Sequence, residues 1–199
     1  MKLFLSRHAE TEHTREGIVQ GHSNSKLSEK GLKQAEALAK EFSQREIDAV
    51  YSSDMKRAAK TAEKIADPQG LKVNKSKDLR EVDRSSFEVK PFEQMVKEIR
   101  ESETEDYLWK PENGESLEET KKRAVERVED IKNNHRGEKI VVISHGGTIG
   151  ATMMGLMGRT AKNSYKLKQS NCSINRLKWD KKRRWQVEKV NETCHLKNI

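Results

Sequence analysis

Residues 140–147 read Ile-Val-Val-Ile-Ser-His-Gly-Gly, and this stretch decides the fold class. Four apolar, β-branched residues in a row are typical of a strand that is buried on both faces, as strands of parallel sheets are. His145 and the two glycines after it open a loop that leads into a Met-rich helix at residues 148–157. Methionines at such positions are more often part of the core than ligands. A buried strand followed directly by a helix predicts an α/β protein.

The alternation of strands and helices extends from this stretch toward both ends of the chain. Ser28 can cap one helix, and Asp54 can cap another that ends before Pro68. Ser116 and Glu119 form a capping box in front of a third, amphipathic helix. The apolar positions of the first helix are Leu32, Ala35, Leu38, Ala39 and Phe42. We expect strands at residues 2–6, 49–51, 71–73 and 140–143, a helix after Pro91, and a terminal hairpin that turns at residues 181–184 between Trp179 and Trp185.

These elements predict an α/β fold with three layers, α/β/α, around a mostly parallel sheet with an antiparallel C-terminal hairpin. The length of 199 residues suits one domain with a core of its own. The least regular stretch begins near residue 84 and ends near residue 115. We therefore expect a single domain over residues 1–199, with a variable, cap-like insert at residues 84–115.

Composition narrows the class of protein. Charged residues make up 36% of the chain, and no apolar run approaches the roughly 20 residues of a membrane span. Cys172 and Cys194 are too few for a disulfide framework, and the sequence contains no Cys-x-x-Cys pair for zinc. The sequence therefore predicts a soluble, cytoplasmic protein without a membrane partner, and it argues against a secreted disulfide scaffold.

The net charge of +8 is unevenly distributed along the chain. Residues 159–199 hold twelve Lys and Arg against three Asp and Glu. Such an asymmetry can mark a nucleic-acid patch, but a solvated basic edge is the more frequent explanation. Charge on an outer strand also discourages edge-to-edge aggregation. We therefore do not expect nucleic acid as a partner, and we keep a nucleic-acid-binding or regulatory protein as an alternative.

Polar side chains follow three of the predicted strands. Arg7 and His8 come after the first strand, Arg57 follows the second, and His145 follows the strand at residues 140–143. Ligands of open α/β sheets bind beyond the carboxyl ends of the strands, so these side chains should meet in one crevice. Two arginines supply bidentate donors for a phosphate, and a neutral imidazole is a competent nucleophile. Each histidine taken singly is more often structural, whereas their joint occurrence predicts phosphate chemistry.

The run Arg7-His8-Ala9-Glu10-Thr11 resembles the Arg-His-Gly-Glu-Thr signature of the histidine phosphatase (phosphoglycerate-mutase-like) superfamily, in its phosphatase branch. The resemblance continues in the family's order to about residue 150. The further matching motifs are Gln20-Gly21, Leu27-Ser28 with Gly31, Ser52-Ser53-Asp54 with Arg57-Ala58, Thr61-Ala62, Leu79-Arg80-Glu81, Gly114-Glu115-Ser116 and Ser144-His145-Gly146-Gly147. Any one of these motifs is a weak signal, but their ordered combination is a strong one.

The resemblance implies a role for each matching residue. His8 would attack phosphorus and carry a phosphohistidine. Arg7, Arg57 and His145 would hold the phosphoryl oxygens and neutralise their charge in the transition state. Glu81 would protonate the leaving oxygen and later activate water. The family's chemistry of this type would need no metal and no cofactor.

Other positions are less settled by the resemblance. Asp83 and Glu88 lie near enough to Glu81 in the sequence to take its place as the acid. Thr14 stands where the family usually has a phosphate-binding Asn, and it keeps a hydroxyl donor. The residues expected to bind the substrate are Arg7, Thr14, Gln20, Gly21, Arg57 and Gly146.

The resemblance implies a metal-independent phosphomonoesterase of the histidine acid phosphatase type, which acts through phosphohistidine on a small phosphorylated metabolite. The alternative on the same fold is a cofactor-dependent phosphoglycerate mutase. Mutases of the family place an Arg directly after the acid, whereas Val82 follows Glu81 here. Residues 101–119 are acidic, with Lys110 as their one basic residue, so we expect them to repel a substrate carboxylate. Hydrolysis is therefore favoured over the mutase reaction.

Overall fold

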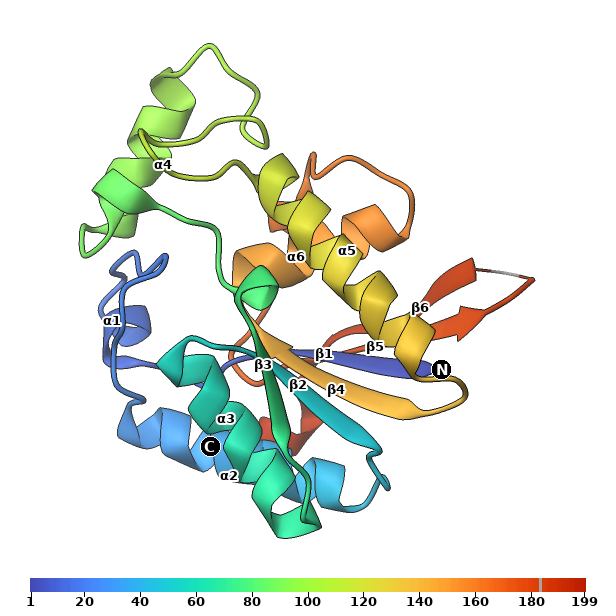
Figure 1. The fold of residues 1–199 in the computed structure, drawn as a ribbon. Coiled ribbons are helices and arrows are strands. Elements are labelled where there is room, and N and C mark those ends of the chain that lie inside the picture. The colour runs from blue at the N-terminus through green and yellow to red at the C-terminus, as the bar shows by residue number, and fades with distance from the viewer. Residues whose placement is uncertain (183) are drawn as a thin grey trace.

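The computed structural model describes residues 1–182 and 184–199, and a six-stranded sheet forms its centre (Figure 1). The strands are β1 (Lys2–Arg7), β2 (Ala49–Ser53), β3 (Val73–Ser76), β4 (Lys139–Ser144), β5 (Ile174–Asp180) and β6 (Arg184–Glu192). Their order in the sheet is β3-β2-β4-β1-β5-β6. The first four are parallel, and β5 is antiparallel to both β1 and β6. The predicted mostly parallel sheet with an antiparallel C-terminal hairpin is confirmed.

Helices cover both faces of the sheet, as the predicted three layers require (Figure 1). On one face lie α2 (Glu29–Ser43) and α3 (Lys56–Ala66), and on the other lie α5 (Leu117–Asn134) and α6 (Gly146–Leu156). Two further helices, α1 (Glu12–Arg15) and α4 (Phe92–Glu101), lie to one side of these layers. Among the described residues, no helix combines the length and the apolar character needed to cross a bilayer.

The central strand β4 connects the layers. Ile140 and Val142 join the apolar cluster beneath α5 and α6, while Val141 and Ile143 join the cluster beneath α2 and α3. All four side chains are fully buried. Burying one such side chain stabilises the fold by about 1.5–3 kcal/mol relative to leaving it exposed. The apolar run read in the sequence therefore holds both helical layers on the sheet.

Two of the three predicted helix caps are confirmed. The hydroxyl oxygen of Ser28 accepts a hydrogen bond from the amide of Gly31 at 3.0 Å, at the start of α2. Ser116 and Glu119 form the predicted capping box at the start of α5. Both caps satisfy backbone N–H groups that have no partner inside their helix, an effect typically of about 1 kcal/mol each.

The prediction that Asp54 caps the next helix is wrong. Met55 occupies the cap position of α3 and makes no side-chain cap hydrogen bond. Asp54 instead accepts two hydrogen bonds from Arg80, at 2.7 and 2.6 Å. The hydrogen bonds from Arg80 lower the pKa of Asp54. A guanidinium fork is a stronger partner for a carboxylate than one backbone amide, which is why Asp54 binds Arg80 instead of capping the helix. The pair joins the end of β2 to the loop that carries Glu81.

Three further details differ from the sequence prediction. Strand β3 begins at Val73 rather than at residue 71, because it is aligned by pairing with β2 from Val50 to Ser53. Helix α6 begins at Gly146, two residues earlier than expected. Leu32 is 45% exposed, so its place on the buried face of α2 is wrong. Gln34 lies on that face instead, where its side-chain oxygen accepts a hydrogen bond from the amide of Glu10.

Residues 84–115 lie away from the sheet, around α4 (Figure 1). Their buried side chains pack with a residue of the loop after β1 in a small cluster of their own, which consists of Val19, Phe87, Met95 and Trp109. Ile18 and Pro91 form an isolated bridge between the same two segments. In the C-terminal hairpin, Trp179 pairs with Trp185, while residue 183 of the predicted turn lies outside the described residues.

Candidate active site

The site begins where two central strands end side by side. Arg7, the last residue of β1, pairs with Ser144, the last residue of β4, and the amide of His8 donates to the carbonyl of Ser144 at 2.9 Å. His8 and His145 follow these strand ends directly. Their ring centroids are 5.1 Å apart, and both side chains are buried. Parallel pairing thus places the two histidines in contact, as the sequence indicated.

The hydrogen bonds of His8 define its tautomer. Its Nδ1 lies 2.7 Å from the carbonyl oxygen of Ala9, and its Nε2 lies 3.2 Å from Nε of Arg57. A carbonyl oxygen only accepts and a guanidinium N–H only donates, so Nδ1 carries the proton and Nε2 keeps its lone pair. The nucleophilic position of this imidazole is therefore Nε2.

Two arginines flank His8, and the protein holds each by backbone carbonyls. Arg57, in the first turn of α3, donates from Nη1 to Ser23 and from Nη2 to Gly21, both at 2.8 Å. Arg7 donates from Nη1 to the carbonyl of Gln169 at 2.8 Å. Backbone carbonyls orient a guanidinium without neutralising it, so both positive charges remain available to an anion.

The buried position of these groups alters their pKa values. Burial first, and then the positive charges of Arg57 and Arg7, lower the pKa of His8 well below its usual 6.5. Burial and Arg57 act in the same way on the pKa of His145. Burial also lowers the pKa of Arg57 to about 10, which leaves that side chain charged near pH 7. The site therefore combines neutral imidazoles with cationic guanidinium groups.

Several buried polar atoms around His8 have no hydrogen-bond partner among the described residues. They are Nε of Arg7 and both ring nitrogens of His145. Leaving a buried polar group unsatisfied typically costs about 1–3 kcal/mol. A tetrahedral oxyanion bound beside His8 would accept from Nε of Arg7 and from the one ring N–H of the neutral His145, which is the arrangement that a phosphoryl group requires.

Glu81 lies at the N-terminus of α6. Its carboxylate accepts hydrogen bonds from the amides of Val82, Gly147 and Thr148, at 2.9, 3.3 and 3.1 Å. A side chain at Gly147 would place its Cβ 2.7 Å from Oε1 of Glu81, so any larger residue there would displace the carboxylate. The second glycine of the His-Gly-Gly motif thus admits the carboxylate into the site.

The two alternative acids have other partners. Asp83 accepts from the amide and hydroxyl of Ser85, at 2.9 Å each, and Glu88 accepts from the amide of His22. Neither contributes to the pocket lining around His8, whereas Glu81 does. Of the three carboxylates, the geometry favours Glu81 as the acid.

A pocket of about 500 Å³ opens over His8. The residues that we expect to bind the substrate all line this pocket, and they are Arg7, Thr14, Gln20, Gly21, Arg57 and Gly146. Gln20 donates to the hydroxyl of Thr14 at 2.8 Å, and that hydroxyl also lies 2.9 Å from the hydroxyl of Thr11. Thr14 is therefore held within a protein network rather than free to replace an asparagine amide.

Sequence reasoning missed part of the pocket. Arg84, Ser164 and Lys168 line it, and the side-chain amide of Asn171 donates to the carbonyl of His8 at 2.9 Å. Arg84 could have been suspected from its place three residues after Glu81. The segment around residues 164–171 carries no motif, so nothing in the sequence pointed to it.

The acidic residues of the segment 101–119, which we expect to repel a substrate carboxylate, do not line the pocket over His8. Of this segment, only Leu117 lines the pocket over His8. Its one basic residue, Lys110, pairs with Glu119 at 2.7 Å on the surface. The segment packs through Trp109 onto the cluster around α4, and none of its acidic residues lines the pocket.

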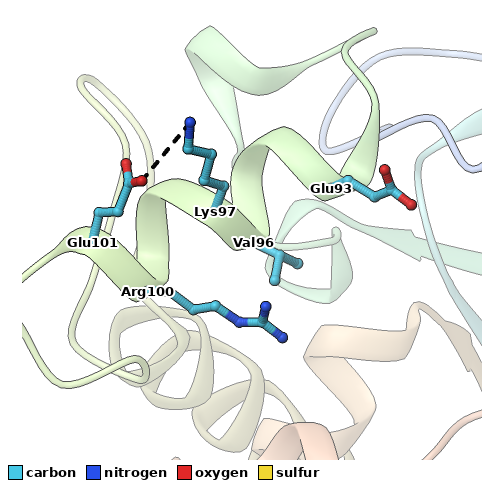
Figure 2. Close-up of a pocket in the computed structure, with 5 residues that line it drawn as sticks. All are labelled: Glu93, Val96, Lys97, Arg100 and Glu101. Carbon is cyan, nitrogen blue, oxygen red and sulfur yellow. Dashed lines mark ion pairs between the residues drawn. The ribbon is translucent and has the colours of Figure 1, made fainter.

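A second hollow lies along α4 itself (Figure 2) and is lined by Glu93, Val96, Lys97, Arg100 and Glu101. Lys97 and Glu101 form an ion pair there at 3.8 Å, with side chains that are 75% and 67% exposed. Such exposed pairs contribute little energy. One helix supplies the whole lining, and the four charged residues in it are all exposed, so this hollow lacks the features of a reactive site.

No group of three or more His, Cys, Asp or Glu side chains within residues 1–182 and 184–199 has an arrangement that could hold a metal ion. Besides His8, the ionisable side chains that line this pocket are Arg7, Arg57, Arg84, Lys168, Tyr165 and Glu81. This set favours an anionic ligand over a cation.

Comparison with known proteins agrees with this geometry. The model of the family described as the histidine phosphatase superfamily (branch 1) matches residues 3–193. A putative phosphoserine phosphatase 2 of Hydrogenobacter thermophilus is 32% identical, over 100% of this chain and 98% of its own length. A probable phosphoglycerate mutase of Yersinia enterocolitica is 29% identical, over 98% of this chain and 95% of its own length.

The similarity extends to solved structures. A mutant phosphoserine phosphatase of Entamoeba histolytica, solved in complex with phosphoserine, superposes with a TM-score of 0.87. It is 26% identical, and the alignment covers 98% of each chain. The family match spans nearly the whole sequence and includes His8, His145, Arg7 and Arg57. This chain therefore belongs to branch 1 of the histidine phosphatase superfamily and is an enzyme of the phosphatase class.

Proposed function

We propose that this enzyme hydrolyses phosphomonoesters without a metal ion, through a phosphohistidine on His8. The observation that carries the proposal is the fixed tautomer of His8, with its Nε2 lone pair beside the unsatisfied donors of Arg7 and His145. A buried, neutral imidazole with one nitrogen held by a carbonyl is an activated nucleophile at neutral pH.

In the first step, Nε2 of His8 attacks phosphorus and the bond from phosphorus to the ester oxygen breaks. Arg57 turns its Nε from His8 to a phosphoryl oxygen, and Arg7 and His145 bind the other oxygens as charge moves onto them. Protonated Glu81 gives its proton to the leaving oxygen, so the product is a neutral alcohol.

In the second step, the carboxylate of Glu81 takes a proton from a water molecule as that water attacks phosphorus. The bond between phosphorus and Nε2 breaks, inorganic phosphate leaves, and His8 and Glu81 return to their starting states. The same pocket admits substrate and water in turn, so no second nucleophilic side chain is required.

The substrate class that we propose is a small phosphorylated metabolite. Two curated relatives from Hydrogenobacter thermophilus are named as phosphoserine phosphatases, one of them putatively. A related structure contains phosphoserine, and another contains 3-phosphoglyceric acid. A pocket of about 500 Å³ is large enough for molecules of this size. Phosphoserine is therefore the first substrate to test.

The decisive experiment is to trap the phosphoenzyme. Wild-type protein mixed briefly with ³²P-labelled phosphoserine and then denatured should retain label that is stable to base and labile to acid. His8→Ala should retain none and should lose turnover, while its circular dichroism spectrum stays unchanged. A matched His135→Ala variant should label normally, since His135 contacts Tyr51 and Glu138 outside the pocket. Turnover in His8→Ala near the wild-type rate would refute the covalent mechanism.

A phosphoglycerate mutase is the second candidate, because relatives 29% identical to this chain carry that name. A mutase must keep water away from its phosphohistidine between two transfers. The experiment is to supply 3-phosphoglycerate with and without 2,3-bisphosphoglycerate, and to measure both free phosphate and 2-phosphoglycerate. We expect phosphate release to dominate. Faster formation of 2-phosphoglycerate, dependent on the bisphosphate, would favour the mutase.

A further inference from the structure

Arg84 is a cation of the pocket that the mechanism above does not use. It stands between Glu81 and the 3-10 turn Ser85–Phe87, and its partly buried side chain lines the pocket over His8. Its backbone carbonyl accepts from the amide of Phe87 at 2.8 Å. Within the part of the chain that the structure describes, its guanidinium has neither a hydrogen-bond partner nor an ion-pair partner.

The two carboxylates whose charges act on Arg84, those of Glu81 and Glu115, already have other donors. Glu81 accepts from the backbone at the start of α6, and Glu115 accepts from Arg123 at 2.8 and 2.7 Å. Burial lowers the pKa of Arg84, and Glu81 and Glu115 only partly oppose this effect. A guanidinium that has lost water without gaining a partner destabilises the free enzyme, and an incoming anion would relieve this.

Arg84 also lies close to the phosphate-binding arginine Arg57. Gly21, whose carbonyl accepts from Arg57, has a φ of +47°, and a Cβ placed on it would lie 3.0 Å from the backbone nitrogen and 3.1 Å from the Cβ of Arg84. A single glycine therefore separates the two arginines. An anion bound by Arg84 and a phosphate bound by Arg57 would belong to the same small molecule.

The charges of the pocket support such a second anion. Its lining contains the cations Arg7, Arg57, Arg84 and Lys168, against the single carboxylate of Glu81. Arg7 and Arg57 flank His8, which leaves Arg84 and the exposed Lys168 for another part of the substrate. Of these two, Arg84 has the planar fork that fits a carboxylate in a bidentate manner.

We infer that Arg84 binds a carboxylate of the substrate, so that this enzyme selects phosphate esters of small hydroxy acids and hydroxy amino acids. The inference rests on the proposed phosphatase function and adds its specificity. An ester that lacks the carboxylate would leave Arg84 unpaired, and its kcat/KM would be lower for that reason.

The test uses two matched pairs of esters. Phosphoserine differs from phosphoethanolamine by the carboxylate, and 3-phosphoglycerate differs from glycerol 3-phosphate by a carboxylate in place of a hydroxymethyl group. Wild-type enzyme should prefer the carboxylate member by about 10- to 100-fold in kcat/KM, the range typical of a hydrogen-bonded charged group. Arg84→Met should remove most of that preference, because it lowers kcat/KM for the carboxylate member of each pair far more than for the member that lacks the carboxylate. Arg84→Lys should retain part of the preference.

Two controls separate this role from others. Arg100→Met removes the same charge from the exposed face of α4 (Figure 2), outside the pocket over His8, and should keep the preference. The Tm of Arg84→Met should not fall, because the lost guanidinium has no partner in the free protein. Inhibition by inorganic phosphate should also stay the same, because that ligand lacks the carboxylate.

The outcomes distinguish the two proposals. If the wild type hydrolyses none of the four esters, the proposed function fails. If it hydrolyses them without preference, or if Arg84→Met loses activity equally on both members of a pair, the phosphatase stands and the role of Arg84 is overturned. A lowered Tm together with equal losses would assign Arg84 to the fold instead.

Discussion

Arg57 donates a hydrogen bond from Nε to Nε2 of His8 across 3.2 Å, on the opposite side of the ring from the bond between Nδ1 and the carbonyl of Ala9. The same arginine therefore fixes the nucleophile's lone pair in the free enzyme and becomes a phosphate ligand when the substrate displaces that contact. Its other two nitrogens stay bound to the carbonyls of Ser23 and Gly21, which limits the movement to a small rotation.

Arg57→Lys should lower kcat about 10²- to 10³-fold, the range found when one oxyanion donor is removed. A lysine keeps the charge but cannot contact Gly21, Ser23 and a phosphoryl oxygen at once. The ¹⁵N chemical shifts of His8 should also show a mixture of tautomers. An exposed Arg136→Lys variant is the control. An unchanged tautomer together with an unchanged kcat would contradict the role of Arg57.

Glu81→Gln should slow phosphoserine hydrolysis about 10²- to 10⁴-fold, the usual contribution of a general acid. It should slow p-nitrophenyl phosphate far less, since p-nitrophenolate leaves without a proton. Steady-state rates on the two esters provide the measurement. Asp83→Asn and Glu88→Gln should not change the ratio of these rates, because neither side chain lines the pocket. Equal losses on both esters in Glu81→Gln would leave Glu81 with a structural role.

The stability of the protein should fall with pH below about 6.5. His8 and His145 have folded-state pKa values well below 6.5, their value when unfolded, so the unfolded chain binds more protons in this range. The associated stability is fully present above pH 6.5 and is lost as pH falls toward the folded-state values. Each histidine contributes a slope of up to about 1.4 kcal/mol per pH unit.

Urea unfolding between pH 7.5 and 5 measures this slope, and His8→Asn should make it shallower. His195, whose pKa is also lowered, contributes equally to both proteins. Asp54 and Glu115 have pKa values below 3.8 and 4.5, so their contributions begin at lower pH. The same slope in wild type and variant would show that His8 is not held neutral by the fold.

Treatment with excess EDTA, followed by desalting into metal-free buffer, should leave the rate on phosphoserine unchanged. The groups over His8 are suited to an anion, and the described residues contain no cluster of metal ligands. Added Mg²⁺ or Zn²⁺ should not raise the rate of the treated enzyme. A loss of activity that a divalent ion restores would contradict the metal-independent mechanism.

Short sequence patterns were sufficient to predict much of the fold and the residues at the centre of the site. The apolar run at 140–143 predicts a strand buried on both faces, and Ser28 and Ser116 mark helix starts through hydrogen bonds that span three residues. His8, His145, Arg7 and Arg57 were found because parallel strands carry the residues after them to one edge. The strand and the helix starts depend on residues close together in the chain. The meeting of the site residues depends on the general rule that the carboxyl ends of parallel strands lie at one edge of the sheet.

Other features depend on which distant groups compete for a side chain, and the fold alone decides them. Asp54 was expected to cap a helix, but Arg80, 26 residues away, offers two stronger hydrogen bonds. Arg7 is oriented by the carbonyl of Gln169, 162 residues further along. Arg84 enters the pocket because Gly21 leaves it room, and the partners that could neutralise it are already bound to other groups. Periodicity and motifs do not predict these partners, because groups far apart in the sequence come into contact only when the chain folds.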